Sequence, residues 1–256
     1  MSLYVPTDDP VWPYPRWVAH RGAGKLAPEN TLAAFRVGAS HGWRMFECDV
    51  RLSADAVPFL LHDATLERTT SGKGVASDLP WAELARLDAG SWHSRAFAGE
   101  PLASLDAVAW YCLRNGFSLN LEIKPAAGAQ SQTGTVVANE AARLWASAPP
   151  HSALPLLTSF EPDTLEAALQ AQEHLPRGLL LDHLWTGWLE TALRLGCQAV
   201  IGEQSLWDAS SVRQGRSAGL KLLSYTVNDE WAAERLLSLG LDGLITDQVD
   251  GFSPAR

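Results

Sequence analysis

The chain has 256 residues, of which 46% are hydrophobic and 19% are charged. This composition supplies a large core and leaves little room for long disordered segments. The net charge of −9 and the isoelectric point of about 5.2 argue against nucleic-acid binding, which depends on clustered Lys and Arg, and against attraction to anionic membranes.

Nine short runs of β-forming residues are predicted strands, and amphipathic helical stretches separate most of them. Such alternation is typical of a parallel sheet with helices outside it, and this many repeats favour a closed (β/α)8 barrel. The alternative is an open doubly wound sheet, although no G-x-G-x-x-G motif follows the first strand. The expected strands are residues 16–20, 44–50, 57–62, 118–124, 154–160, 177–182, 198–202, 221–227 and 243–247.

Capping and stop signals indicate four helices most clearly. They are expected at about 28–41, at 80–88, at 105–115 and at 230–239. Their flanking residues are Pro28 and Gly42 for the first helix, Ser77 or Asp78 with Pro80 for the second, Ser104 and Gly116 for the third, and Asp229 and Gly240 for the fourth.

The nine predicted strands are one more than an eight-stranded barrel contains. Residues 53–56 are too few for a crossover helix, so residues 50–62 form either a local hairpin or an extended excursion that includes a parallel strand. Residues 63–103 hold one clear helix and many polar or Gly positions. They are expected to form a small insertion after the third strand, near the mouth of the barrel. Residues 1–256 are expected to form one domain.

Two predicted strands carry charged residues at alternate positions, Glu47 with Asp49 and Glu122 with Lys124. Alternate residues share a strand face, and Cys48 between the acids suits the helix-facing side, so the charged groups point into the barrel. One buried acid is more often part of a structural ion pair, here with Lys124 or an arginine. Three would repel one another, and a divalent cation with oxygen ligands, Mg²⁺ or Ca²⁺, would relieve the repulsion.

Two histidines, His20 and His62, lie at the C-terminal ends of predicted strands, where barrel active sites form. Such a histidine alone is more often a core or capping residue. Together with Arg21 and Lys124, however, the pair suits a phosphodiester, because cations bind the phosphate oxygens and two imidazoles supply an acid and a base. Ser159 lacks the nucleophile elbow of a serine hydrolase. The remaining histidines are expected at the surface: His41, His93, His151, His174 and His183.

Cellular location is predicted from the cysteines and the N-terminus. Cys48, Cys112 and Cys197 are far apart and lie in apolar surroundings, which is typical of reduced core thiols in a cytoplasmic protein. Residues 1–17 lack the basic start and apolar stretch of a signal peptide, and no apolar run is long enough to span a membrane. No stable membrane anchor is expected, and the oligomeric state is not indicated.

Several motifs resemble those of the glycerophosphodiester phosphodiesterases, and in particular the cytosolic bacterial enzymes of glycerol 3-phosphate uptake. The similarity covers about residues 16–248. It is carried by VAHRGAGKLAPENTLAAF, FECDVRLSADAVPFLLHDATLERTTSGKG, LNLEIKP, TSF, LLSYTVND and GLITD.

The resemblance implies a TIM barrel of the phospholipase-C-like phosphodiesterase type that hydrolyses glycerophosphodiesters to sn-glycerol 3-phosphate and an alcohol. A substrate hydroxyl would attack the phosphorus, and water would then open a cyclic phosphate. A lysophospholipid-active relative and a non-catalytic glycerophosphate-binding protein are the alternatives. The implied roles are the acid/base pair for His20 and His62, ligation of one divalent cation for Glu47, Asp49 and Glu122, phosphate contact for Arg21 and Lys124, glycerol contact for Phe160 and Tyr225, and orientation of neighbours for Asn30 and Asp63.

Overall fold

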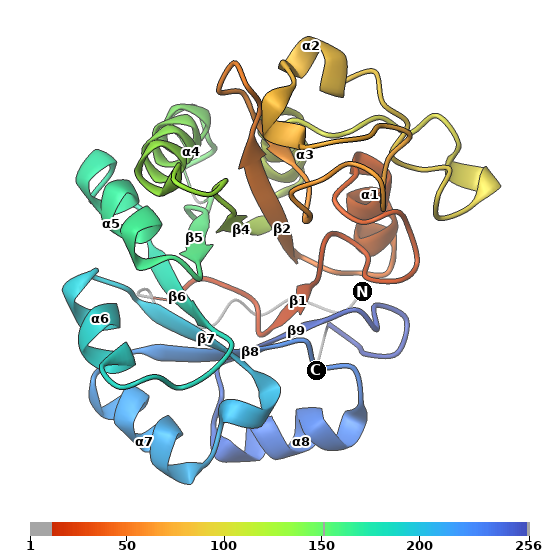
Figure 1. Ribbon diagram of the computed structural model, residues 1–256. Helices are drawn as coiled ribbons and strands as arrows, with labels where there is room; N and C mark the ends of the chain where they lie inside the picture. Colours follow the sequence, from red (N-terminus) through yellow and green to blue (C-terminus); the bar gives the residue numbers. More distant parts are fainter. Residues whose placement is uncertain (1–11, 151, 255–256) are drawn as a thin grey trace.

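The computed structural model describes residues 12–150 and 152–254, and its centre is a closed barrel of eight parallel strands inside a ring of helices (Figure 1). Strand β1 pairs with both β2 and β9, which closes the barrel. The predicted (β/α)8 fold is therefore confirmed. In order around the barrel the strands are β1 (Trp17–Ala19), β2 (Met45–Leu52), β4 (Ser118–Ile123), β5 (Leu156–Ser159), β6 (Arg177–Leu181), β7 (Ala199–Glu203), β8 (Lys221–Tyr225) and β9 (Gly243–Thr246).

Helices cover the outside of the barrel, and two of them have the predicted ends. Ser104 and Asp229 cap α3 and α8 through their side chains, and Gly116 and Gly240 end the same helices in the left-handed conformation. The helices are α1 (Leu32–Ser40), α2 (Trp81–Leu84), α3 (Leu105–Asn115), α4 (Gln130–Trp145), α5 (Pro162–Ala171), α6 (Trp188–Arg194), α7 (Ala209–Ser217) and α8 (Glu230–Leu239), with 3₁₀ helices η1 (Ala76–Asp78), η2 (Arg95–Phe97) and η3 (Gln204–Leu206).

The predicted start of the first helix is wrong, because α1 begins at Leu32 and Pro28 lies in the loop before it. Asn30 has a φ of +60°, which a right-handed helix does not accommodate. Its side chain instead reaches Asp49, and Thr31 caps the helix by accepting the N–H of Ala34 at 3.2 Å.

The predicted helix at 80–88 is too long. Helix α2 ends at Leu84, and Asp88 bends the chain into a loop by accepting the backbone N–H groups of Gly90, Ser91 and Gly99. Ser77 and Asp78 lie in η1 and do not cap α2, whose N-cap position is taken by Pro80 without a side-chain bond.

The extra predicted strand is resolved as a hairpin. Strand β3 (Pro58–Leu60) runs antiparallel to β2 on the outside of the barrel, with Val50 opposite Leu60. Strand β3 is not one of the eight barrel strands, and the third barrel strand is β4. The segment that follows β3 therefore lies in the chain between the second and third barrel strands. This segment has an apolar cluster of its own, formed by Phe59, Leu61, Leu66, Ala76, Leu84, Ala89 and Leu102.

The barrel interior changes from apolar to charged along the strands. Trp12 and Tyr14 pack with inward residues such as Met45, Leu180 and Ile245 in one cluster. Further along β2 the same face carries Glu47 and Asp49, while Cys48 on the other face packs in the layer between the barrel and the helices. The predicted orientation of this strand is therefore confirmed.

No helix within residues 12–150 and 152–254 is long and apolar enough to cross a membrane. The three cysteines are buried and free. The assignment of all of residues 1–256 to one domain stays a prediction.

Arg177, at the start of β6, joins the ends of two helices. The residue is 5% exposed, and its guanidinium donates to backbone carbonyls that follow α5 and α6. Among these bonds are those to Leu175 O at 2.5 Å, Glu173 O at 3.1 Å and Leu195 O at 3.1 Å. A cation at helix C-termini also opposes the negative ends of the helix dipoles.

Replacing Arg177 with Met is expected to lower the free energy of unfolding by about 3 kcal/mol, because buried carbonyls lose their donors. Urea unfolding followed by circular dichroism measures the change. Arg194→Met is the control, since Arg194 makes an exposed ion pair with Glu166, of a kind that contributes at most about 1 kcal/mol. Equal losses in the two variants would contradict this role for Arg177.

Candidate active site

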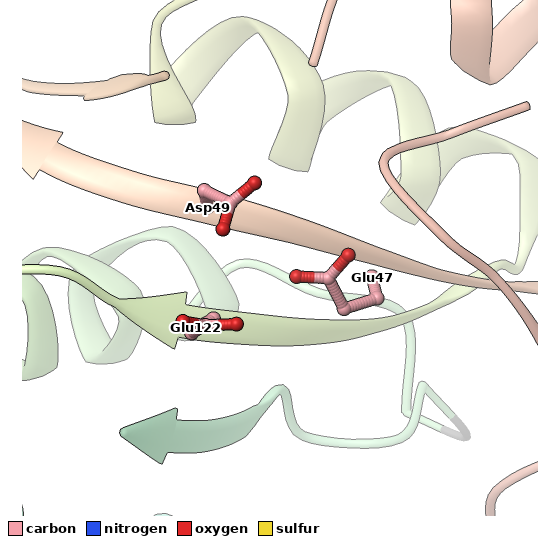
Figure 2. Close-up of side chains that lie close together, drawn as sticks. All are labelled: Glu47, Asp49 and Glu122. Atoms are coloured by element: carbon pink, nitrogen blue, oxygen red, sulfur yellow. The ribbon is translucent and has the colours of Figure 1, made fainter. Parts of the chain in front are cut away.

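Three carboxylates meet inside the barrel. Glu47 and Asp49 come from β2 and Glu122 from the neighbouring β4, and Figure 2 shows their side chains directed toward a common space. The register places Asp49 beside Glu122, and one oxygen of each of the three residues lies within 4.8 Å of the others. Glu47 and Asp49 are almost fully buried. The cluster therefore concentrates negative charge where water cannot screen it.

Two cations partly neutralise this cluster. Lys124 Nζ lies 2.5 Å from Glu122 Oε1 and 3.4 Å from Asp49 Oδ1, and Arg21 Nε lies 3.3 Å from Asp49 Oδ2. The ion pair between Glu122 and Lys124 that the sequence suggested is thus present. Burial opposes ionisation of Asp49, but Arg21 and Lys124 lower its pKa on balance. Burial and the charge of Asp49 raise the pKa of Glu122.

Glu47 accepts a hydrogen bond at only one of its two carboxylate oxygens. Its Oε2 accepts the backbone N–H of Arg21 at 3.1 Å, but its buried Oε1 has no hydrogen-bond partner among the described residues. Burial, followed by the charge of Asp49, raises its pKa to about 8. An unpartnered buried oxygen within an all-carboxylate set fits a hard divalent cation, which would bind to Glu47, Asp49 and Glu122.

His20 lies directly after β1 and is held by a carboxylate outside the cluster, that of Asp247. Its Nδ1 is 2.6 Å from Asp247 Oδ1, and its Nε2 is 3.7 Å from Glu47 Oε2. Asn228 fixes Asp247 by donating to Oδ2 at 3.0 Å and accepting the Asp247 N–H at 2.9 Å. Burial opposes protonation of His20, but the bond to Asp247 and the charge of Glu47 raise its pKa overall.

His62, just beyond β3, has the same arrangement. Its Nδ1 lies 2.7 Å from Asp63 Oδ1, and Arg51 fixes its backbone carbonyl with an N–H bond of 2.7 Å. Burial lowers the pKa of His62 below its ordinary value. In both histidines a carboxylate at Nδ1 favours the tautomer whose Nε2 can accept a proton.

The loop after β1 sets this geometry through unusual backbone angles. Arg21 has a φ of +51°, and Gly24, at +53°, packs so closely on Asp247 that a Cβ would lie 2.1 Å from its carbonyl oxygen. Asn30 at +60° donates to Asp49 Oδ2 at 2.8 Å and accepts the Asp49 N–H at 3.1 Å. The loop thus brings both a cation and an amide onto the carboxylate cluster.

Phe160 and Tyr225 lie together on one side of the site. Their rings meet edge to face with centroids 5.8 Å apart, and Lys124 Nζ lies 5.8 Å from the centre of the Phe160 ring. Tyr225 donates its hydroxyl to Leu181 O at 3.1 Å. All eleven predicted site residues are therefore brought to this end of the barrel, in the contacts given above.

Five supporting residues were not predicted from the sequence. Asp247 contacts His20, Asn228 contacts Asp247, and Arg51 contacts the carbonyl of His62. Glu29 contacts Arg21, and Arg68 contacts Asp63 and Glu29. Asp247 follows β9 directly, so the strand-end criterion that selected the two histidines could have found it. Of the other histidines, His41, His174 and His183 are exposed, His93 is half-buried with Nε2 3.0 Å from Lys25 O, and His151 lies outside the described residues.

Mg²⁺ affinity is expected to rise between pH 6 and pH 8 and then to level off. Glu47 is protonated below its pKa of about 8, so an ion must displace that proton, and affinity gains up to about tenfold per pH unit. Calorimetry in buffers of different ionisation enthalpy should show proton release on binding. Glu47→Gln should bind weakly and remove the release; a wild-type affinity that is flat from pH 6 to pH 8 would contradict this expectation.

Comparisons with known proteins agree with this geometry. The model of the glycerophosphoryl diester phosphodiesterase family matches residues 20–251. A glycerophosphodiester phosphodiesterase of Caldanaerobacter subterraneus is 31% identical over 91% of this chain and 94% of its own. A phosphodiesterase of Oleispira antarctica, solved in complex with the product sn-glycerol 3-phosphate, is 33% identical, covers 94% of this chain and 96% of its own, and superposes with a TM-score of 0.87. This chain therefore belongs to the glycerophosphoryl diester phosphodiesterase family.

Proposed function

We propose that the protein hydrolyses glycerophosphodiesters to sn-glycerol 3-phosphate and an alcohol, with one divalent cation and with His20 and His62 as the acid/base pair. The observation that carries this proposal is the pairing of two carboxylate-held imidazoles with a buried three-carboxylate cluster at the mouth of the barrel. The product bound to the Oleispira relative supports the glycerophosphate half of the substrate.

The phosphate is proposed to bind between Arg21 and Lys124. Both side chains are mostly buried and remain cationic, because the neighbouring carboxylates raise their pKa values against the effect of burial. A divalent cation held by Glu47, Asp49 and Glu122 would act as a Lewis acid toward the phosphoryl oxygens. The two side chains would orient the diester and oppose its negative charge.

Proton transfer is proposed to use the Nε2 atoms of His20 and His62. One imidazole takes the proton of a glycerol hydroxyl as that oxygen bonds to phosphorus, and the other protonates the departing alcohol as its P–O bond breaks. Water then opens the cyclic phosphate by the reverse proton transfers. Attack by a hydroxyl of the substrate itself avoids the entropy cost of positioning a second reactant.

The aromatic pair Phe160 and Tyr225 is proposed to contact the glycerol, and Asn30 and Asp63 to orient Asp49 and His62. Since these groups bind the glycerophosphate half, we propose a broad preference for the alcohol. Mg²⁺ and Ca²⁺ both suit an all-oxygen site. We also propose that the protein acts in the cytoplasm, which its buried, free cysteines support.

His20→Ala and His62→Ala are each expected to lower release of sn-glycerol 3-phosphate from glycerophosphocholine by about 10²–10⁴-fold, since each removes a proton-transfer group. A chelator should abolish release by the wild type, and added Mg²⁺ or Ca²⁺ should restore the wild type but not the variants. His174→Ala, at an exposed histidine, should remain fully active.

Three outcomes would count against the proposal. No release with any divalent cation would make lysophospholipids the next substrates to test, and a chain that binds glycerophosphate without turnover would be a binding protein. Activity that survives both the chelator and His62→Ala would exclude the proposed site.

A further inference from the structure

Arg68 has no role in the function proposed above, yet it forms four hydrogen bonds with two carboxylates beside the site. Its Nε and Nη2 donate to the two oxygens of Asp63, at 2.6 and 3.0 Å. Its Nη1 and Nη2 donate to the two oxygens of Glu29, at 2.9 and 2.8 Å. Four of the five guanidinium N–H groups are therefore used, in two fork-shaped pairs.

Each of these carboxylates also holds a different group of the site. Asp63 contacts His62 Nδ1 at 2.7 Å, and Glu29 accepts from Arg21 Nη1 at 2.9 Å. A continuous series of contacts thus runs from His62 through Asp63, Arg68 and Glu29 to Arg21. One end lies in the segment that follows β3, and the other in the loop that follows β1.

We infer that Arg68 is a positioning residue. By holding Asp63 and Glu29 at a fixed separation, it fixes the position of His62 relative to Arg21. The inference rests on the proposed roles of His62 and Arg21. It also gives the segment after β3 a part in catalysis, because Arg68 joins that segment to the loop that carries the phosphate-contacting cation.

The shape of the guanidinium is central to this role. A planar fork fixes both the distance and the angle between two carboxylates, whereas the ammonium of a lysine fixes neither. The Arg68 side chain is 43% exposed, so its ion pairs contribute little to stability. Its effect is therefore expected in catalysis more than in folding.

The pH profile separates positioning from simple support of the fold. The charged groups that act on His62 are Asp49, Arg21, Asp63 and Lys124, and all remain when Arg68 is replaced. Without Arg68, the positive charge that offsets Asp63 is lost, so Asp63 favours the protonated form of His62 more strongly. The limb of the profile that reports His62 should then move to higher pH, whereas a loss of fold alone would lower activity without moving the limb.

The test compares Arg68→Met with Arg143→Met. Arg143 is the matched control, because it is also exposed and bridges two carboxylates, Glu140 and Asp106, but on the outer helices α3 and α4. Arg68→Met should lower kcat about 10–100-fold with KM changed less than about threefold, and should raise the His62 limb by about half a pH unit. Arg143→Met should leave kcat and the pH profile unchanged, and both variants should unfold at similar urea concentrations.

Two further variants test how Arg68 acts. The kcat of Arg68→Lys should exceed that of Arg68→Met by less than about tenfold, because lysine restores the charge without the planar fork. In an Asp63→Asn background, Arg68→Met should lower kcat much less than it does in the wild type, since both substitutions interrupt the same contacts.

Arg68→Met that matches Arg143→Met in kcat and pH profile, or a loss that adds fully to that of Asp63→Asn, would overturn the inference. These results are read in a wild type whose activity His62→Ala lowers by about 10²–10⁴-fold. Failure of that control would count against the proposed function itself, so the two failures remain distinguishable.

Discussion

Mutual repulsion among Glu47, Asp49 and Glu122 governs how the residues around them are arranged. Three carboxylates this close inside a barrel are tolerated only where cations, hydrogen bonds or a bound ion offset their charge. Arg21, Lys124 and Asn30 supply part of that compensation, and each comes from a different position in the chain. Burial and the charge of Asp49 still raise the pKa of Glu47 to about 8, so compensation is incomplete, and the three carboxylates could hold a divalent cation.

The two histidines share one arrangement, a carboxylate at Nδ1, which would suit the proton transfers proposed for them. Asp247 serves His20 and Asp63 serves His62, and each carboxylate is fixed by a further side chain, Asn228 or Arg68. The supporting residues come from opposite parts of the chain. Hydrogen bonds thus connect the segments that follow β1, β3 and β9 around the site.

Strand alternation separates stability from function within the barrel. Inward residues at one level, such as Met45 and Leu180, form an apolar layer with Tyr14, while Glu47 and Asp49 occupy the next levels of the same strand face. Cys48 and Val50 on the opposite face pack against the helices. One strand can therefore anchor the core and present the carboxylates, because successive side chains point to opposite sides.

Features that follow from local periodicity could be predicted from the sequence: the alternating strands and helices, the inward direction of Glu47 and Asp49, and the caps at Ser104 and Asp229. Contacts that follow from closure of the barrel could not be predicted in this way, because they join distant parts of the chain. The contact of His20 with Asp247 spans 227 residues and exists because β1 pairs with β9. Asn30 leaves the predicted helix to reach Asp49, and Arg68 meets Glu29 across 39 residues. Sequence spacing does not encode such meetings, because they arise from the path of the whole chain.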